Sequence, residues 1–135
     1  MDVQIAALCD FAADYGSKLC LMGTFDTIMA AQFPSIHPSC SIALRMVFRD
    51  TDAGRHVFKV TLIDEDGKSL LPKIEPAIDV RLPDNVFFIT QNLIFNLQGM
   101  KFEKAGQYSI DIAMDGKMIA RIPMQVIPMK QKPSP

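Results

Sequence analysis

The sequence lacks several of the features that usually point to a function. It contains no tryptophan, only two tyrosines, and 14 basic residues that are nearly balanced by 15 acidic ones. A balanced charge provides no electrostatic attraction to nucleic acid or to an anionic membrane, because both partners require clustered Lys and Arg. We therefore expect no nucleic-acid partner and no membrane partner.

Long apolar runs are also missing. No stretch approaches the ~20 consecutive apolar residues that a membrane-spanning helix requires. Residues 1–18, MDVQIAALCDFAADYGSK, have no basic region before their apolar run, and Asp10 and Asp14 interrupt that run, so they do not resemble a signal peptide. If Met1 is the native start, we expect the protein in the cytoplasm.

Cysteine is scarce as well. Cys9, Cys20 and Cys40 are odd in number, have apolar neighbours and show no C-x-x-C spacing. This pattern favours buried, reduced thiols over disulfides, a redox motif or a metal site. Cys9 and Cys20 could face each other across a hairpin if the intervening turn has the right length.

The clearest positive pattern lies in residues 102–126, FEKAGQYSIDIAMDGKMIARIPMQV. Apolar residues alternate with small or polar ones from Tyr108 to Met114, and Asp115-Gly116 then supplies the residues that a tight turn needs. The segment is predicted to form a β-hairpin. Pro123 in its second strand predicts a sheet edge or a bulge at that position.

Similar alternation and turn signals predict further strands. We expect residues 3–12 and 18–25 to form a hairpin around residues 14–17, and residues 40–49 and 56–63 to form a second antiparallel pair. A short strand at residues 68–71 is a further option, and Gly99 is expected to end the longest strand. The predicted segments are 3–12, 18–25, 40–49, 56–63, 77–82 and 86–98.

Eight or nine short strands without an amphipathic helix predict an all-β fold. The expected architecture is a two-sheet antiparallel β-sandwich, immunoglobulin-like or jelly-roll-like, with a closed barrel as the alternative. The chain length suits one domain, residues 1–127. Residues 128–135 form a short, basic, proline-rich segment that we expect to be a disordered tail.

Residues 26–39 break the strand pattern. Because Pro34 and Pro38 prevent a sustained period, this segment is predicted to be one long loop. Loops of this length are often functional, and the apolar Met29, Phe33 and Ile36 are candidates for binding a partner. Docking of the loop over the end of the sandwich, as a lid on the core, explains them equally well.

Candidates for catalysis or metal binding are weak. His37 and Cys40 are three residues apart, but three residues of extended chain span about 10 Å, so a nucleophile–base pair is disfavoured against a loop histidine and a core thiol. The run Asp64-Glu65-Asp66-Gly67 lacks the ligand spacing of a calcium loop and favours a hairpin turn. We expect no metal and no cofactor.

The longest predicted strand carries polar side chains on one face. Thr90, Asn92, Asn96 and Gln98 form this amide stripe, which could bind a sugar or a peptide strand through hydrogen bonds. A solvated sheet face with ordinary amides is the alternative. We list the stripe, together with His37 and the apolar loop residues, as candidate binding residues.

Three segments, DFAADYGSKLCLMGTFD, FPSIHP and NLQGMKFEKAGQYSIDIAMDG, together resemble a family of small bacterial proteins described as a domain of unknown function. The resemblance extends from about Ala7 to Val126. It implies a small β-sandwich and supplies no catalytic residues. The stretch from Phe102 to Tyr108 also resembles the start of late strands in immunoglobulin-like domains, where a tyrosine hydroxyl caps a neighbouring loop.

These observations favour a non-enzymatic cytoplasmic protein-interaction module. A small-molecule or carbohydrate-binding sandwich domain is the alternative, and a hydrolase that uses His37 or His56 ranks below both. Self-association through an edge strand near Pro123 is compatible with each hypothesis.

Overall fold

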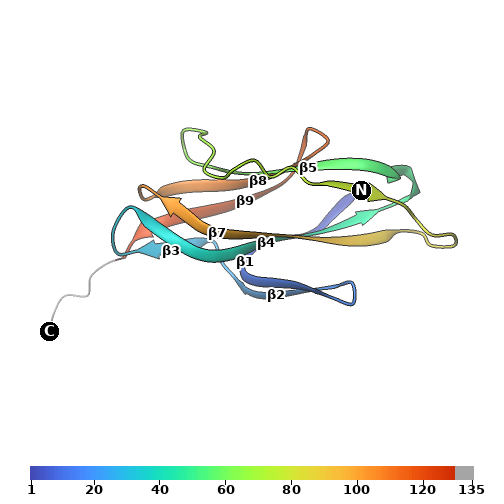
Figure 1. Cartoon of the computed structure of the whole chain (residues 1–135), viewed down its shortest axis with the longest axis horizontal. Coiled ribbons are helices and arrows are strands. Elements are labelled where there is room, and N and C mark those ends of the chain that lie inside the picture. Colours follow the sequence, from blue (N-terminus) through green and yellow to red (C-terminus); the bar gives the residue numbers. More distant parts are fainter. Residues whose placement is uncertain (130–135) are drawn as a thin grey trace.

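The computed structural model describes residues 1–129, and over this range the chain forms β-strands joined by turns and a single 3₁₀ turn (Figure 1). This confirms the predicted all-β class and the expected number of strands. The elements are β1 (Asp2–Tyr15), β2 (Lys18–Thr24), β3 (Thr27–Ala30), β4 (Ser35–Phe48), η1 (Asp50–Asp52), β5 (Gly54–Ile63), β6 (Ala77–Val80), β7 (Ile89–Phe102), β8 (Gly106–Met114) and β9 (Lys117–Pro128).

The strands form two sheets. The first has the order β2-β1-β4-β7, and the second has the order β3-β9-β8-β5-β6. Side chains from both sheets pack into one core, with Ile42 and Leu44 on β4 and Phe58 and Ile110 on the second sheet fully buried. The alternation of apolar residues along β5 therefore reflects one buried face, as the sequence predicts, whereas Ser41 and Ala43 in the other row of β4 are buried as well.

Two expected features of strand pairing are wrong. Residues 40–49 and 56–63 do not pair, because β4 lies between β1 and β7 whereas β5 lies between β8 and β6. The polar connection between β4 and β5 contains η1 and carries the chain from one sheet to the other. Within this connection the amide of Arg49 donates a hydrogen bond to the Asp52 carboxylate at 2.8 Å. The sheets are also not antiparallel throughout, since β3 runs parallel to β9.

The predicted long loop at residues 26–39 is also wrong. It contains β3 and the start of β4, so only Asp26 and residues 31–34 of this segment lie between strands. The backbone hydrogen bonds of β3 come from a distant part of the chain: Gln125 N donates to Asp26 O and Met129 N to Ala30 O, each at 2.8 Å. A partner that far along the chain leaves no local pattern, which is why the segment looked irregular.

The boundaries of β7 differ from the expected ones at both ends. The predicted strand begins at residue 86, but Val86, Phe87 and Phe88 precede β7, and Phe87 is 92% exposed. Gly99 does not end the strand but continues it with a φ of 63°. The short strand expected at residues 68–71 is reduced to a single bridge between Ser69 and Ile63.

The β8–β9 hairpin is confirmed, with Asp115 and Gly116 at φ values of 50° and 82° in its turn. Pro123 pairs with Ser109, and β3 covers the other side of β9 only from Gln125 onward. The half of β9 that contains Pro123 thus pairs only with β8 within the described residues. The irregularity in register lies between Ile112 and Ala113 rather than at Pro123. Of the predicted disordered tail, Pro128 is the last residue of β9, and residues 130–135 lie outside the described residues.

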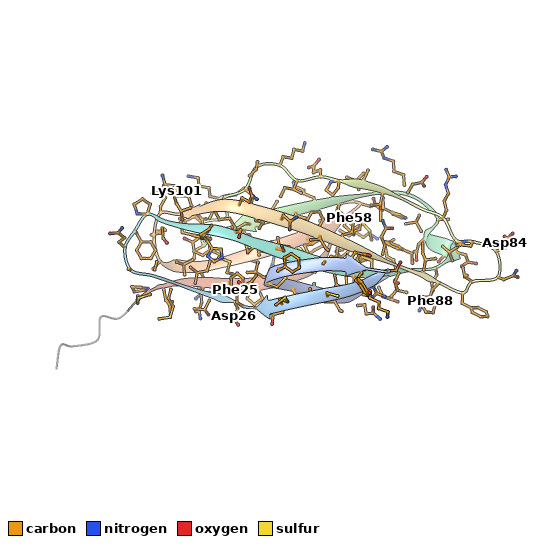
Figure 2. The ribbon with its side chains drawn as sticks, turned by 60° about the horizontal axis from the view of Figure 1, so that its bottom comes forward. Phe25, Asp26, Phe58, Asp84, Phe88 and Lys101 are labelled. Atoms are coloured by element: carbon orange, nitrogen blue, oxygen red, sulfur yellow. The ribbon has the colours of Figure 1, made fainter. Side chains whose placement is uncertain are left out.

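The β1–β2 hairpin leaves the plane of its sheet. β1 pairs with β4 from Asp2 to Cys9 and with β2 from Cys9 to Tyr15. Beyond Cys9 the hairpin folds back over the outer face of β4 and β7, below that sheet in Figure 1 and in front of it in Figure 2. Its inner apolar residues form a second small cluster with the sheet; the members are Cys9, Ala12 and Ala43, with Leu19, Leu21 and Ile94 packed against them.

A glycine permits this bend. Gly23 has a φ of +68°, and a Cβ at this position would lie 2.5 Å from the Asp10 carboxylate oxygen. Cys9 pairs with Thr24 rather than with Cys20, and Cys20 is exposed on the outer side of the hairpin. The prediction of a buried thiol is therefore confirmed for Cys9 and Cys40, and it is wrong for Cys20.

Candidate functional site

One end of the amide stripe lies beneath the tip of the β1–β2 hairpin and contacts it through hydrogen bonds. Arg45 on β4 donates through Nη1 to the Asn92 side-chain oxygen at 2.7 Å and through Nη2 to the Thr90 hydroxyl at 3.0 Å. The same guanidinium donates to the Ser17 carbonyl at 2.9 Å. Asn92 in turn donates to the Asp14 carboxylate at 2.8 Å. The polar groups of Thr90 and Asn92 are thus used inside the protein.

The other end of the stripe is more open. Asn96 accepts a hydrogen bond from the buried Ser41 hydroxyl at 2.8 Å, although its own side chain is exposed. Gln98 is exposed and stands opposite Ser39 of β4. The structure therefore divides the four predicted residues into a pair beneath the hairpin and a pair near the surface.

The four candidate binding residues within residues 26–39 also lie in different environments. Met29 and Ile36 are exposed, whereas Phe33 is partly buried against the core. The His37 ring lies 5.6 Å from the Phe25 ring, and its buried Nε2 has no hydrogen-bond partner among the residues that the structure describes. The four residues do not form one surface.

The Cys40 thiol lies in the main core. Burial raises the pKa of Cys40 to about 11. Since the thiolate is the nucleophile, this environment opposes nucleophilic chemistry at neutral pH. The spacing of His37 and Cys40 therefore does not produce an activated thiol.

His56 joins three segments. Its Nδ1 lies 2.6 Å from the Asp115 carboxylate in the β8–β9 turn, and its Nε2 lies 2.6 Å from the carbonyl oxygen of Asp52 in η1. The ring stacks on Phe48 with 6.0 Å between centroids. The hydrogen bond to Asp115 is the main reason that the pKa of His56 is raised above its usual value.

The same contacts restrict what His56 can do chemically. Both ring nitrogens face acceptors, an arrangement that suits a doubly protonated imidazolium. A general base needs a free nitrogen lone pair, and neither ring nitrogen presents one in this geometry. We interpret His56 as a structural link rather than as the base of a hydrolase.

The described residues offer no group of three His, Cys, Asp or Glu side chains with the geometry to hold a metal ion. Within residues 1–129 there is also no helix long and apolar enough to cross a membrane.

Sequence reasoning missed the outer face of the β1–β2 hairpin. Cross-strand pairing places Phe11 opposite Met22, Ala13 opposite Cys20, and Tyr15 opposite Lys18. Phe11, Tyr15 and Met22 are 55%, 72% and 65% exposed. We call these six residues the hairpin face. The signal was present in the sequence, because the run AALCDFAA is apolar at both odd and even positions, and only one side of a hairpin can pack on the sheet.

The loop before β7 exposes two more aromatic residues. Phe87 and Phe88 are 92% and 53% exposed. They lie at the end of the molecule toward which the hairpin tip points, where Figure 1 shows the start of β7 and Figure 2 labels Phe88. Exposed aromatic residues are thus concentrated on the hairpin and at this neighbouring end.

The chain belongs to a family of unknown function, DUF6941, whose sequence model matches residues 4–127. This match confirms the resemblance to an uncharacterised domain, while a bacterial origin stays a prediction. No curated protein sequence matches the chain.

Among solved structures, a glycosyl hydrolase family 2 member from Bacteroides cellulosilyticus DSM 14838 is similar over 69% of this chain and 14% of its own, with a TM-score of 0.36 and 12% identity. A second structure of a family 2 member from Bacteroides cellulosilyticus has the same TM-score and identity and is covered to 13%. A beta-glucuronidase from glycoside hydrolase family 2 is similar over 75% of this chain and 12% of its own, with a TM-score of 0.34 and 12% identity. This chain spans only a small part of each of these proteins, and likeness at this level transfers no activity.

Proposed function

We propose that the chain is a non-enzymatic protein-interaction module, a two-sheet β-sandwich that binds a partner protein through the hairpin face. The observation that carries the proposal is the exposure of Phe11, Tyr15 and Met22 on one side of a hairpin whose other side is packed on the sheet. Contiguous exposed apolar side chains on a soluble domain are typical of interaction sites. Aromatic residues and Met are also enriched where proteins contact each other.

The hairpin face is held in place before any partner arrives. Ala12, Leu19 and Leu21 anchor its underside, and the bond from Arg45 to the Ser17 carbonyl anchors its tip. A preorganised surface loses less conformational entropy on binding than a mobile loop. This favours the hairpin over the exposed residues of β3 and early β4 as the principal contact.

The charges around the hairpin indicate the chemistry of the partner. Asp10, Asp14 and Asp26 lie in or beside the hairpin, and Lys18 is the one basic residue in the same stretch. A mainly acidic rim around an apolar centre suits a partner with an apolar patch bordered by Lys or Arg. The exposed Cys20 thiol supports a reducing compartment, and we propose the cytoplasm on that basis.

A second candidate function is the binding of a small polar molecule. Two shallow depressions of about 210 and 420 Å³ flank Gln107 and Tyr108, with Asp26 and Gln125 lining the first and Asp64 and Glu65 the second. The first is smaller than a typical ligand cavity, which is roughly 300–1,000 Å³. Thermal-shift measurements with sugars and nucleotides test this candidate.

Affinity capture with paired variants tests the main proposal. Met22→Lys places a charge on the hairpin face, whereas Met29→Lys makes the same change on β3 at a residue that is similarly exposed, 54% against 65%. We expect the wild type and Met29→Lys to retain the same protein from native lysate and Met22→Lys to lose it. The retained protein is then titrated in purified form against all three.

The opposite pattern, with binding lost in Met29→Lys and kept in Met22→Lys, would assign the contact to β3 and reject the hairpin face. Equal melting temperatures of the two variants show that neither result comes from unfolding.

A further inference from the structure

β7 is a long edge strand. It runs from Ile89 to Phe102, pairs with β4 along this length, and ends the order of the first sheet. Within the described residues no strand pairs with its other side. The backbone amides and carbonyls on that side are therefore free to pair with an added strand.

Among the strands that end the two sheet orders in the described chain, β2, β3 and β6 are protected, but β7 is not. β3 and β6 have four residues each, and β6 carries Asp79; β2 has seven residues and carries Lys18. Short strands, charged side chains and proline are the usual means by which proteins prevent pairing at sheet edges. β7 has no charged residue and no proline from Ile89 to Met100.

The core is also less completely covered at this edge. Ile42 and Leu44 on β4 are fully buried, whereas their register partners on β7, Phe95 and Leu93, remain partly exposed. An additional strand beside β7 would cover these apolar side chains. The edge therefore offers both unpaired backbone groups and apolar surface.

We propose that β7 pairs antiparallel with β7 of a second copy of this chain, about a two-fold axis perpendicular to the sheet. The first sheets of the two copies, with four strands each, would then form one continuous sheet. A two-fold interface uses the same surface on both subunits and therefore has to be self-complementary.

The sequence of β7 satisfies this condition. Paired residues in an antiparallel ladder point to the same side, so the register that pairs Ile94 with Ile94 of the second copy brings the inner residues up to Leu97 of the two copies against each other. In this register Leu93 faces Phe95, Asn96 faces Asn92, and Gln98 faces Thr90. Beyond Gly99, which has a φ of 63°, the alternation shifts, and Met100 and Phe102 are the buried residues. Because no charges occur between Ile89 and Met100, no like charges face each other there.

Charge-swapped variants test this pairing. Ile94→Lys, and its counterpart Ile94→Glu, each place two like charges opposite each other at the centre of the two-fold interface. We expect light scattering under reducing conditions to give a dimer for the wild type and half that mass for each of these variants. An equal mixture of the two variants should regain the dimer mass, which also shows that both are folded.

The matched control is Met22→Lys, which adds a charge on the hairpin face and leaves β7 unchanged. We expect it to remain dimeric. A monomeric wild type at its highest soluble concentration, a dimer that survives both variants at Ile94, or a dimer lost in Met22→Lys would each overturn the β7 pairing. The first two results leave partner capture by the hairpin face unaffected, so the two proposals can fail separately.

Discussion

Arg45 on β4 donates to the backbone carbonyl of Ser17 at the tip of the β1–β2 hairpin, 2.9 Å away. Its other donors reach Gln4, Thr90 and Asn92 at 2.7 to 3.0 Å. One guanidinium therefore connects two neighbouring strands to a hairpin that crosses their outer face. The position of the hairpin depends on this contact as well as on apolar packing.

The first prediction concerns this contact. Arg45→Met keeps the aliphatic stem and removes every donor, so we expect a loss of about 1–3 kcal/mol in the free energy of unfolding. Arg81→Met is the control, because Arg81 is highly exposed and its pair with Asp79 should contribute less than about 1 kcal/mol. Urea denaturation measures both. Equal losses would show that the Arg45 network adds nothing beyond a surface ion pair.

The second prediction concerns the bend in β1. Gly23→Ala introduces both an unfavourable positive φ and a contact with Asp10. Gly16→Ala introduces only the first, because its φ is +55° and a Cβ there would meet nothing within 4 Å. We expect Gly16→Ala to cost about 1 kcal/mol and Gly23→Ala clearly more. Similar values in denaturant titrations would contradict the close approach of Gly23 and Asp10.

The third prediction concerns pH. Hydrogen bonds to Asp115 and to the Asp52 carbonyl raise the pKa of His56 in the folded state. A raised pKa stabilises the fold fully below the unfolded value of about 6.5, and this contribution is lost as pH rises through the folded pKa. The wild type should therefore lose stability relative to His56→Gln as the pH rises above about 6.5 and through the raised pKa of the folded state.

Asp115 should show the opposite dependence on pH. Its pKa is lowered, first by the His56 hydrogen bond and then by the Val57 amide, so its contribution is lost in acid as pH falls through the folded pKa. Denaturant titrations of wild type and His56→Gln across both ranges distinguish the two groups. Parallel stability curves above pH 6.5 would mean that His56 is not held as an imidazolium.

The fourth prediction concerns the thiols. Cys20 is exposed, whereas Cys9 and Cys40 are buried and their pKa values are raised by burial. In native protein we expect a chromogenic disulfide reagent to modify one thiol per chain rapidly, and the other two only after denaturant is added. Cys20→Ser should remove the rapid phase. Rapid modification of that variant would place a second thiol at the surface.

Features that depend on neighbouring residues were predictable from the sequence. The turn at Asp115-Gly116 and the alternation from Tyr108 to Met114 identified the β8–β9 hairpin, and the resemblance to immunoglobulin-like strands anticipated a capping tyrosine. The Tyr108 hydroxyl does donate to the Lys104 carbonyl, at 2.7 Å. In each case the partner lies within a few residues, so a short window contains the information.

Features that depend on distant pairing were not predictable. The parallel partner of β3 lies at the other end of the described chain, and nothing in residues 26–39 indicates it. The same limit applies to the candidate site. Asn92 and Thr90 look like free polar groups in the sequence, and only the bend at Cys9 brings Asp14 and Ser17 over them. The exposed hairpin face follows from the same bend.

The β3–β9 pairing also affects the order in which the chain can fold during synthesis. The side-chain bond from Gln125 to Thr27 joins residues 98 positions apart. Residues 27–30 therefore have no partner until residue 128 has left the ribosome, and closing so long a loop slows folding. Nascent chains that stop short of β9 will expose Ile28 and Ala30, which are buried in the finished fold, and should depend on chaperones until the last strand arrives.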